Sequence, residues 1–166
     1  MTTLPEGWSD FFVATTGAGA ALAGLIIVAM TANIKMIIGI QGMTSRAGAT
    51  IGSLTLIVVA GAVALIPGQG ALFVGLEILV VSVVVLGINL DSAWRVVQAS
   101  RRPDYASGPP APKIALSLAQ IVPFLVGAVM LLTGDWSGLY WVAGGMIVVF
   151  MASVLNAWIL LVEILR

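Results

Sequence analysis

The sequence predicts an all-α integral membrane protein built as a bundle of five transmembrane helices. Of its 166 residues, 60% are hydrophobic and only 8% are charged, whereas soluble domains are roughly 45–50% apolar and about 25% charged. Five apolar stretches reach the length of about 20 residues that a helix needs to cross a bilayer. Because these stretches take up most of the chain, we expect one transmembrane domain covering residues 1–166.

The predicted helices are separated by short connections and cover about residues 10–38, 47–66, 71–97, 113–132 and 139–164. The first is uncharged from Phe11 to Ile34, longer than the roughly 7–15 apolar residues of a cleavable signal peptide. We therefore expect it to remain as a transmembrane helix. The second is followed by Pro67-Gly68-Gln69-Gly70, a strong turn signal. A re-entrant hairpin of the second and third segments is an alternative, but the second is long enough to span by itself.

The remaining connections and the fourth helix contain the prolines that shape them. Residues 101–112 are Pro-rich, which predicts a cytoplasmic linker rather than a helix. Within the fourth helix, Pro123 has no backbone N–H and frees the carbonyl group near Ala119, so we expect a kink there. No connection is long enough for an extramembrane domain.

The distribution of charge predicts the orientation. With the N-terminus outside, every Lys and Arg falls on the cytoplasmic side, as the positive-inside rule requires; these residues are Lys35, Arg46, Arg95, Arg101, Arg102, Lys113 and Arg166. The outer side receives Glu6, Asp10 and Asp135 and no basic residue. Aromatic residues are expected at both interfaces, with Trp8, Trp136, Tyr140 and Trp141 outside and Trp94, Tyr105 and Trp158 inside. The predicted topology is N-terminus outside and C-terminus cytoplasmic.

Small residues predict how the helices pack. Transmembrane helices associate through close van der Waals approach, which small residues spaced four apart allow. The residues chosen for this role are Gly17, Ala21 and Gly24 in the first helix and Gly48 and Gly52 in the second. The first helix carries small residues on nearly every face, more than one partner helix needs. We therefore expect a homo-oligomer, or a place within a larger membrane complex.

Glu77 is the first candidate for an ion path. It lies about a turn and a half into the third helix from the outer side. A carboxylate at that depth is expected to face protein, water or a cavity rather than lipid. One interpretation is a cation or proton site near an outer mouth. The other, slightly favoured, is a structural carboxyl group that is uncharged or hydrogen-bonded to a neighbouring helix.

Four carboxamides form the second candidate feature. Asn33, Asn89, Gln120 and Asn156 each stand in the cytoplasmic half of a different helix, and Thr50 and Ser53 stand at a similar depth in the remaining one. Such a level of polar groups is expected either to line a wet vestibule open to the cytoplasm or to form interhelical hydrogen bonds. The second interpretation is favoured, because polar residues commonly join membrane helices.

Catalysis and metal binding are not expected. The chain has no Cys and no His, which excludes thiol nucleophiles, Cys/His metal sites and the usual general base. No serine is paired with a suitable base, and the aspartates stand near the interfaces. We predict that the protein is not an enzyme and needs no metal or cofactor. The formal net charge of zero gives no reason to expect nucleic acid.

Both ends of the chain resemble a known group of proteins. The segments 11–25, FFVATTGAGAALAGL, and 156–166, NAWILLVEILR, are similar to small bacterial membrane proteins, some of them labelled modulator of FtsH protease. The better-known modulators of that protease have more spans than this chain. The resemblance implies a bacterial cytoplasmic membrane location and transfers no functional residue.

Two functions are compatible with these features. The first is a small oligomeric membrane protein that forms a pore or permeation path for cations or small solutes. The alternative is a non-catalytic accessory or regulatory subunit, packed against a larger membrane complex or membrane protease. In either case the lipid bilayer is the first partner.

Overall fold

The computed structural model describes residues 4–35, 43–100, 115 and 118–164. The helices of this part of the chain are α1 (Trp8–Ala32), α3 (Met43–Ala64), α4 (Ala71–Ser100), α6 (Val122–Leu132) and α7 (Gly138–Ile164). The described residues contain no strand, so the all-α class is confirmed for them. By length and composition, α1, α3, α4 and α7 can each cross a membrane. The chain is therefore a helical protein with four candidate membrane-spanning helices.

The fourth predicted span is only partly described. Leu118 and Ala119 are helical, Gln120 and Ile121 form a turn, and α6 begins at Val122 with only 11 residues. Pro123 stands in the first turn of α6 and cannot donate to the carbonyl of Ala119. The N–H of Ile121 instead donates to the carbonyl of Leu118 at 3.0 Å. The predicted kink therefore corresponds to a break in the helix, and residues 101–114, with most of the predicted linker, lie outside the described residues.

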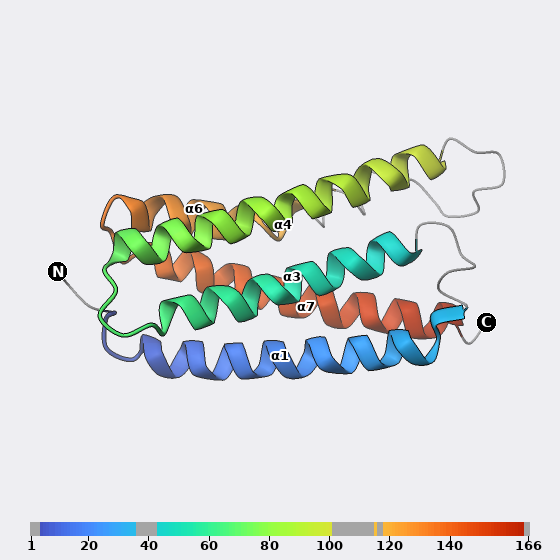
Figure 1. Cartoon of the computed structure of the whole chain (residues 1–166), viewed down its shortest axis with the longest axis horizontal. Helices are drawn as coiled ribbons and strands as arrows, with labels where there is room; N and C mark the ends of the chain where they lie inside the picture. Colours follow the sequence, from blue (N-terminus) through green and yellow to red (C-terminus); the bar gives the residue numbers. More distant parts are fainter. Residues whose placement is uncertain (1–3, 36–42, 101–114, 116–117, 165–166) are drawn as a thin grey trace.

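The helices lie side by side with roughly parallel long axes (Figure 1). Following the chain, α1 packs against α3, α3 against α4, α4 against α6 and α6 against α7, while α7 also contacts α3. The turns at residues 65–70 and 133–137 lie at one end of the bundle, together with the start of α1. We call this the acidic end, because Glu6, Asp10 and Asp135 belong to it. The opposite end, where α1 and α4 finish, is the basic end.

Both turns at the acidic end have left-handed glycines. Gly68 has φ 78° and Gly134 has φ 85°, values that an L side chain disfavours. The first turn is the one predicted at Pro67–Gly70. In the second, the carboxylate of Asp135 accepts hydrogen bonds from the Ser137 N–H at 2.8 Å and the Ser137 hydroxyl at 2.6 Å. These bonds lower the pKa of Asp135, the hydroxyl bond contributing most.

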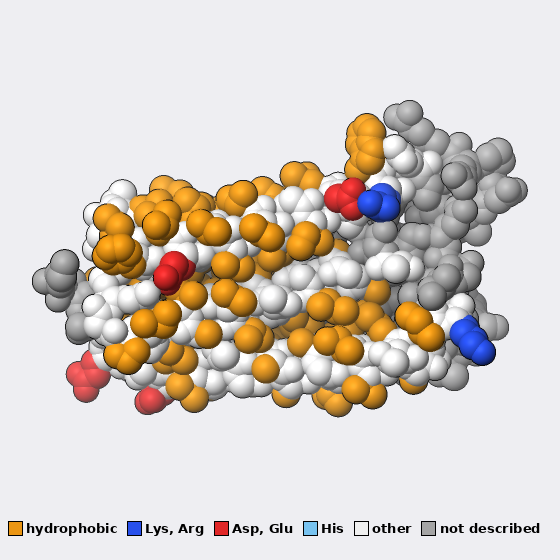
Figure 2. All heavy atoms as spheres, viewed as in Figure 1, with side chains coloured by type: hydrophobic (Ala, Val, Ile, Leu, Met, Phe, Trp, Pro, Cys, Tyr) orange, Lys and Arg blue, Asp and Glu red, His pale blue; other side chains and the backbone are white. Residues whose placement is uncertain are grey.

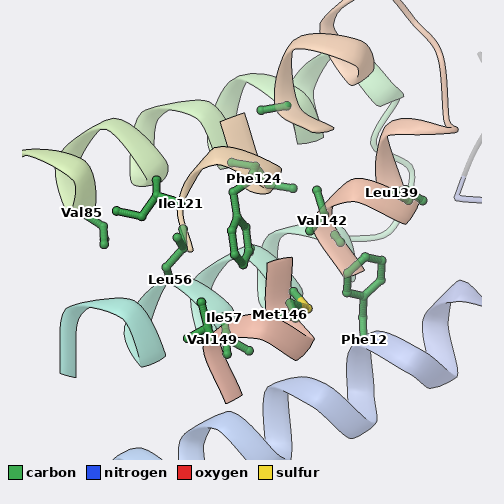
Figure 3. Packing of buried hydrophobic residues seen from close by; sticks show 14 of the residues in the cluster. Phe12, Leu56, Ile57, Val85, Ile121, Phe124, Leu139, Val142, Met146 and Val149 are labelled. Carbon is green, nitrogen blue, oxygen red and sulfur yellow. The ribbon is translucent and has the colours of Figure 1, made fainter. Parts of the chain in front are cut away.

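The core joins all five helices. Phe12, Phe124, Val142 and Met146 are almost fully buried and point into one cluster with side chains of α3 and α4 (Figure 3). Outside this cluster, large hydrophobic side chains are exposed along the length of the bundle (Figure 2). An apolar exterior of this kind suits lipid, where the core must be held by close packing rather than by removal of apolar surface from water.

Glycine contacts bring the backbones together in the half of the bundle near the acidic end. A Cβ at Gly75 of α4 would lie 2.9 Å from the Ala128 carbonyl oxygen and 2.8 Å from the Leu131 Cβ of α6. Gly127 and Gly138 bring α6 and α7 into backbone contact in the same way, and a Cβ at Gly61 of α3 would collide with the Thr16 hydroxyl of α1. Gly75, Gly127 and Gly138 have no room for a methyl group, because the close atoms include backbone, whereas at Gly61 the close atom is a side-chain hydroxyl.

Most of the glycines predicted for packing have no close neighbour among the described residues. There, a Cβ at Gly17, Gly24 or Gly48 would meet nothing within 4 Å, and one at Gly52 would meet Ile88 at 3.9 Å. Ala21 is exposed. The role predicted for these residues therefore stays a prediction about contacts outside this chain.

Candidate functional site

Glu77 lies in the second turn of α4, near the acidic end. The Gln69 side-chain amide, from the turn before α4, donates to Glu77 Oε1 at 3.3 Å and to Oε2 at 3.2 Å. Both distances exceed the roughly 2.7–2.9 Å of strong charge-assisted hydrogen bonds. The Gln69 Oε1 atom is itself buried and has no hydrogen-bond partner among the described residues. The pair thus presents three oxygen atoms and one weakly bonded amide.

No positive charge accompanies this carboxylate. Glu77 is partly exposed, and no described Lys or Arg side chain lies within salt-bridge distance of it. The described basic side chains are Lys35, at the end of α1, and Arg95, which pairs with Asp91 at 2.8 Å as its i,i+4 spacing predicts. Both belong to the basic end. This carboxylate, about 9 Å from the start of a membrane helix at 1.5 Å per residue, therefore has no counter-ion among the described side chains.

The structure contains part of the predicted level of carboxamides. Asn89 and Gln120 are buried in the bundle, with exposed fractions of 2% and 5%. Asn33 is not part of this core, because it lies at the end of α1, partly exposed, and its amide donates to the Ala29 carbonyl at 3.0 Å. The side chain of Asn156 lies outside the described residues. The structure thus brings two of the four predicted carboxamides into one core.

Two serines complete the level in the structure. Ser53 of α3 and Ser153 of α7 have exposed fractions of 3% and 1%. Ser53 stands four residues before Ile57, Ser153 four after Val149 and Asn89 four after Val85, so each lies one turn along the same helix face. Ile57, Val85 and Val149 lie together in the core (Figure 3). We call Ser53, Asn89, Gln120 and Ser153 the polar layer.

An apolar layer adjoins the polar layer on the side of the acidic end. It consists of Leu56, Ile57, Val85, Ile121 and Val149, all at most 4% exposed. These side chains come from α3, α4, the turn before α6, and α7 (Figure 3). Thr50 and Ser92 are also buried, with exposed fractions of 5% and 9%, and lie closer to the basic end than the polar layer. Buried polar side chains are therefore more frequent toward the basic end, although Ser82 of α4, 0% exposed, lies on the acidic side of the apolar layer.

Sequence reasoning predicts part of this level. The prediction includes Thr50 and Ser53, whereas Ser92 and Ser153 are not part of it. The signal is the i,i+4 step from a core valine, which puts Asn89 and Ser153 on the same helix faces as Val85 and Val149. A prediction based on carboxamides alone does not include Ser153.

The structure offers no metal cluster among its described residues, where no group of three or more His, Cys, Asp or Glu side chains converges. Comparisons with protein-family models, curated proteins and solved structures found no match. The class of protein is therefore defined by the fold and the described side chains: a helical bundle with an apolar exterior, whose described part contains four candidate membrane-spanning helices.

Proposed function

We propose that the protein works as an oligomer of identical subunits in the bacterial cytoplasmic membrane and provides a path for cations or small solutes. In this proposal the basic end faces the cytoplasm. The predicted fourth helix, which contains α6, also crosses the membrane, giving five spans in total. The observation that carries the proposal is Glu77, a partly exposed carboxylate on an otherwise apolar surface whose hydrogen-bond partner among the described residues is the Gln69 amide.

The placement of charge favours a path between subunits. Exposure of a carboxylate to lipid is costly, so this surface needs cover by protein or water. A second copy in the same orientation brings no Lys or Arg to the acidic end, since the described basic side chains are at the other end. Copies arranged around an axis would instead bring several Glu77 side chains together, and rings of acidic side chains select cations.

A path through one subunit fits less well. The apolar layer fills the middle of the bundle, and Phe12, Phe124 and Leu131, closer to the acidic end, are 0% exposed. A charged solute crossing this core would lose its hydration without gaining polar contacts. The shared surface between subunits is therefore the better route.

Ion flux into liposomes tests the proposal. A carboxylate 4 Å from a cation contributes about 4 kcal/mol at an effective dielectric constant of about 20, so Glu77→Gln should lower cation flux at least about tenfold. Glu6→Gln, the same substitution at an exposed residue before α1, is the matched control and should leave flux within about twofold. Absence of flux from the unsubstituted protein, or equal flux in Glu77→Gln, would refute the cation path.

The second candidate function is a non-catalytic subunit of a larger membrane complex or protease. The observation that favours it is the open surface of α1, where Gly17 and Gly24 have space around them and Ala21 is exposed. Such a surface suits another helix as well as a second copy. Co-purification from its native membrane in a fixed ratio with a different protein, together with absence of flux, would favour this function over the first.

A further inference from the structure

The Gln69 amide and the Glu77 carboxylate stand at the distance that oxygen ligands keep around a small cation. The Gln69 Nε2 atom lies 3.3 Å from Glu77 Oε1 and 3.2 Å from Oε2. Two ligands at right angles and this far apart are each about 2.3 Å from a shared ion, within the roughly 2.3–2.6 Å at which oxygen coordinates Ca²⁺. The pair therefore has the spacing of a cation site when the amide presents its oxygen, rather than its nitrogen, to the carboxylate.

The Gln69 amide can turn over at little cost. Rotation about the last side-chain bond of glutamine exchanges the amide nitrogen and oxygen, and this torsion is broad and nearly two-fold. The orientation in the structure has two long hydrogen bonds at one end of the amide and a buried oxygen without a described partner at the other. The turned orientation also leaves one end without a described partner, so it loses only the two long bonds. A cation held by the turned amide and the carboxylate replaces them with contacts to three oxygens.

The charge of the pair favours a monovalent ion. Glu77 supplies one negative charge, and α3 and α6 are the helices that pack most extensively against α4. Neither α6 nor the turn at residues 65–70 contains a charged residue, and the one in α3 is Arg46, in its first turn at the basic end. A monovalent ion neutralises the carboxylate. A divalent ion would instead leave a net positive charge in apolar surroundings, which is costly.

We propose that Glu77 and Gln69 bind a small monovalent cation of the size of Na⁺, and that the Gln69 amide turns its oxygen toward the ion on binding. Na⁺ is close to Ca²⁺ in radius, whereas K⁺ is larger and keeps its oxygen ligands farther apart. An ion of this size takes about six oxygens, so water or a neighbouring subunit completes its shell at the partly exposed side of Glu77. The inference rests on the cation path proposed above and names its ion.

Equilibrium dialysis of the purified protein against radioactive Na⁺ measures binding without transport. Binding should be saturable, and K⁺ in about tenfold excess should displace little of the bound Na⁺. Glu77→Gln should weaken binding at least about tenfold, because it removes the negative charge. Glu6→Gln, the same substitution at an exposed residue before α1, is the matched control and should leave the affinity within about twofold.

Two variants of Gln69 test the role of its oxygen. Gln69→Leu removes the amide but keeps an uncharged side chain, and should weaken Na⁺ binding at least about tenfold. Gln69→Glu keeps an oxygen at the same reach and adds a second negative charge, so Ca²⁺ should displace Na⁺ from this variant at least about tenfold more readily than from the unsubstituted protein. A merely structural Gln69 would not change which ion binds. Unchanged elution in size-exclusion chromatography shows that each variant is folded, and if Gln69→Leu does not fold, Gln69→Glu and the K⁺ competition carry the test.

Three results would overturn the inference. The first is the absence of saturable Na⁺ binding, and the second is equally tight binding of K⁺. The third is a choice of ion in Gln69→Glu that matches that of the unsubstituted protein. Dialysis and liposome flux also separate this inference from the proposed function. Cation flux that depends on Glu77 without Na⁺ binding would leave the path in place and refute its ion, whereas Na⁺ binding without flux would refute the path and leave the site.

Discussion

A methyl group added at Gly75 tests the packing of α4 against α6. The new Cβ in Gly75→Ala would lie 2.8 Å from the Leu131 Cβ, 2.9 Å from the Ala128 oxygen and 2.9 Å from the Leu132 nitrogen. Two of these atoms belong to the backbone, so a side-chain rotation cannot relieve the overlap and the helices must separate. Overpacking of a filled core costs about 1–3 kcal/mol.

Gly87→Ala is the matched control, since Gly87 lies on the same helix with nothing within 4 Å of its Cβ position. Alanine is a better helix former than glycine by about 1 kcal/mol, and this gain is common to both variants. The free energy of unfolding should therefore be lower in Gly75→Ala than in Gly87→Ala by about 1–3 kcal/mol. Reversible unfolding in mixed detergent and SDS micelles, followed by circular dichroism, measures the difference. Equal stability of the two variants would show that α4 and α6 are not in backbone contact.

Three further predictions concern other contacts. Gly61→Ala should destabilise the protein less than Gly75→Ala, because rotation of the Thr16 side chain can move the hydroxyl that its Cβ would meet, and the same unfolding assay measures this. If Gly48→Ala leaves the free energy of unfolding unchanged but weakens an oligomer in native mass spectrometry, its predicted packing role lies between subunits. Ser137→Ala should raise the pKa of Asp135 toward its ordinary value, because it removes the hydroxyl bond, which contributes most, while the backbone N–H bond stays. A carbon-13 NMR titration of the carboxyl group measures this. Because the pKa of Asp135 is lower in the folded state, its carboxylate stabilises the fold above its unfolded pKa, and this contribution is lost as pH falls through the folded pKa. Ser137→Ala should therefore reduce the loss of stability in acid. An unchanged dependence of the free energy of unfolding on pH would contradict a role for the Ser137 hydroxyl bond.

Much of the fold could be predicted, because a membrane-spanning helix requires a long apolar stretch that is visible in the sequence. The helices at 8–32, 43–64, 71–100 and 138–164 agree with four predicted spans to within a few residues at most ends, since lipid demands long apolar runs. The turn predicted at Pro67–Gly70 is present, with Gly68 at positive φ. The topology and the fifth span remain predictions.

Packing partners were harder to predict, because glycine spacing along one helix does not say which neighbour faces it. Gly17 and Gly24 belong to the predicted packing set but have no neighbour within 4 Å of a Cβ position in the described part of the chain, whereas Gly75 and Gly127, which are outside that set, are in backbone contact. The polar layer shows the same limit. Asn89 and Gln120 were identified by residue type, but Asn33 fails to join them because α1 lies at the edge of the bundle, in contact mainly with α3.

Cross-linking at Glu77 tests the proposed oligomer most directly. The chain has no cysteine, so Glu77→Cys provides one reactive position per subunit, and Val129→Cys on α6, 54% exposed, provides a control on another surface. If Glu77 faces a shared axis, oxidation or a short bifunctional thiol reagent in native membranes should link subunits through Glu77→Cys and not through Val129→Cys. Monomers only, or equal cross-linking at both positions, would contradict a Glu77-lined path between subunits.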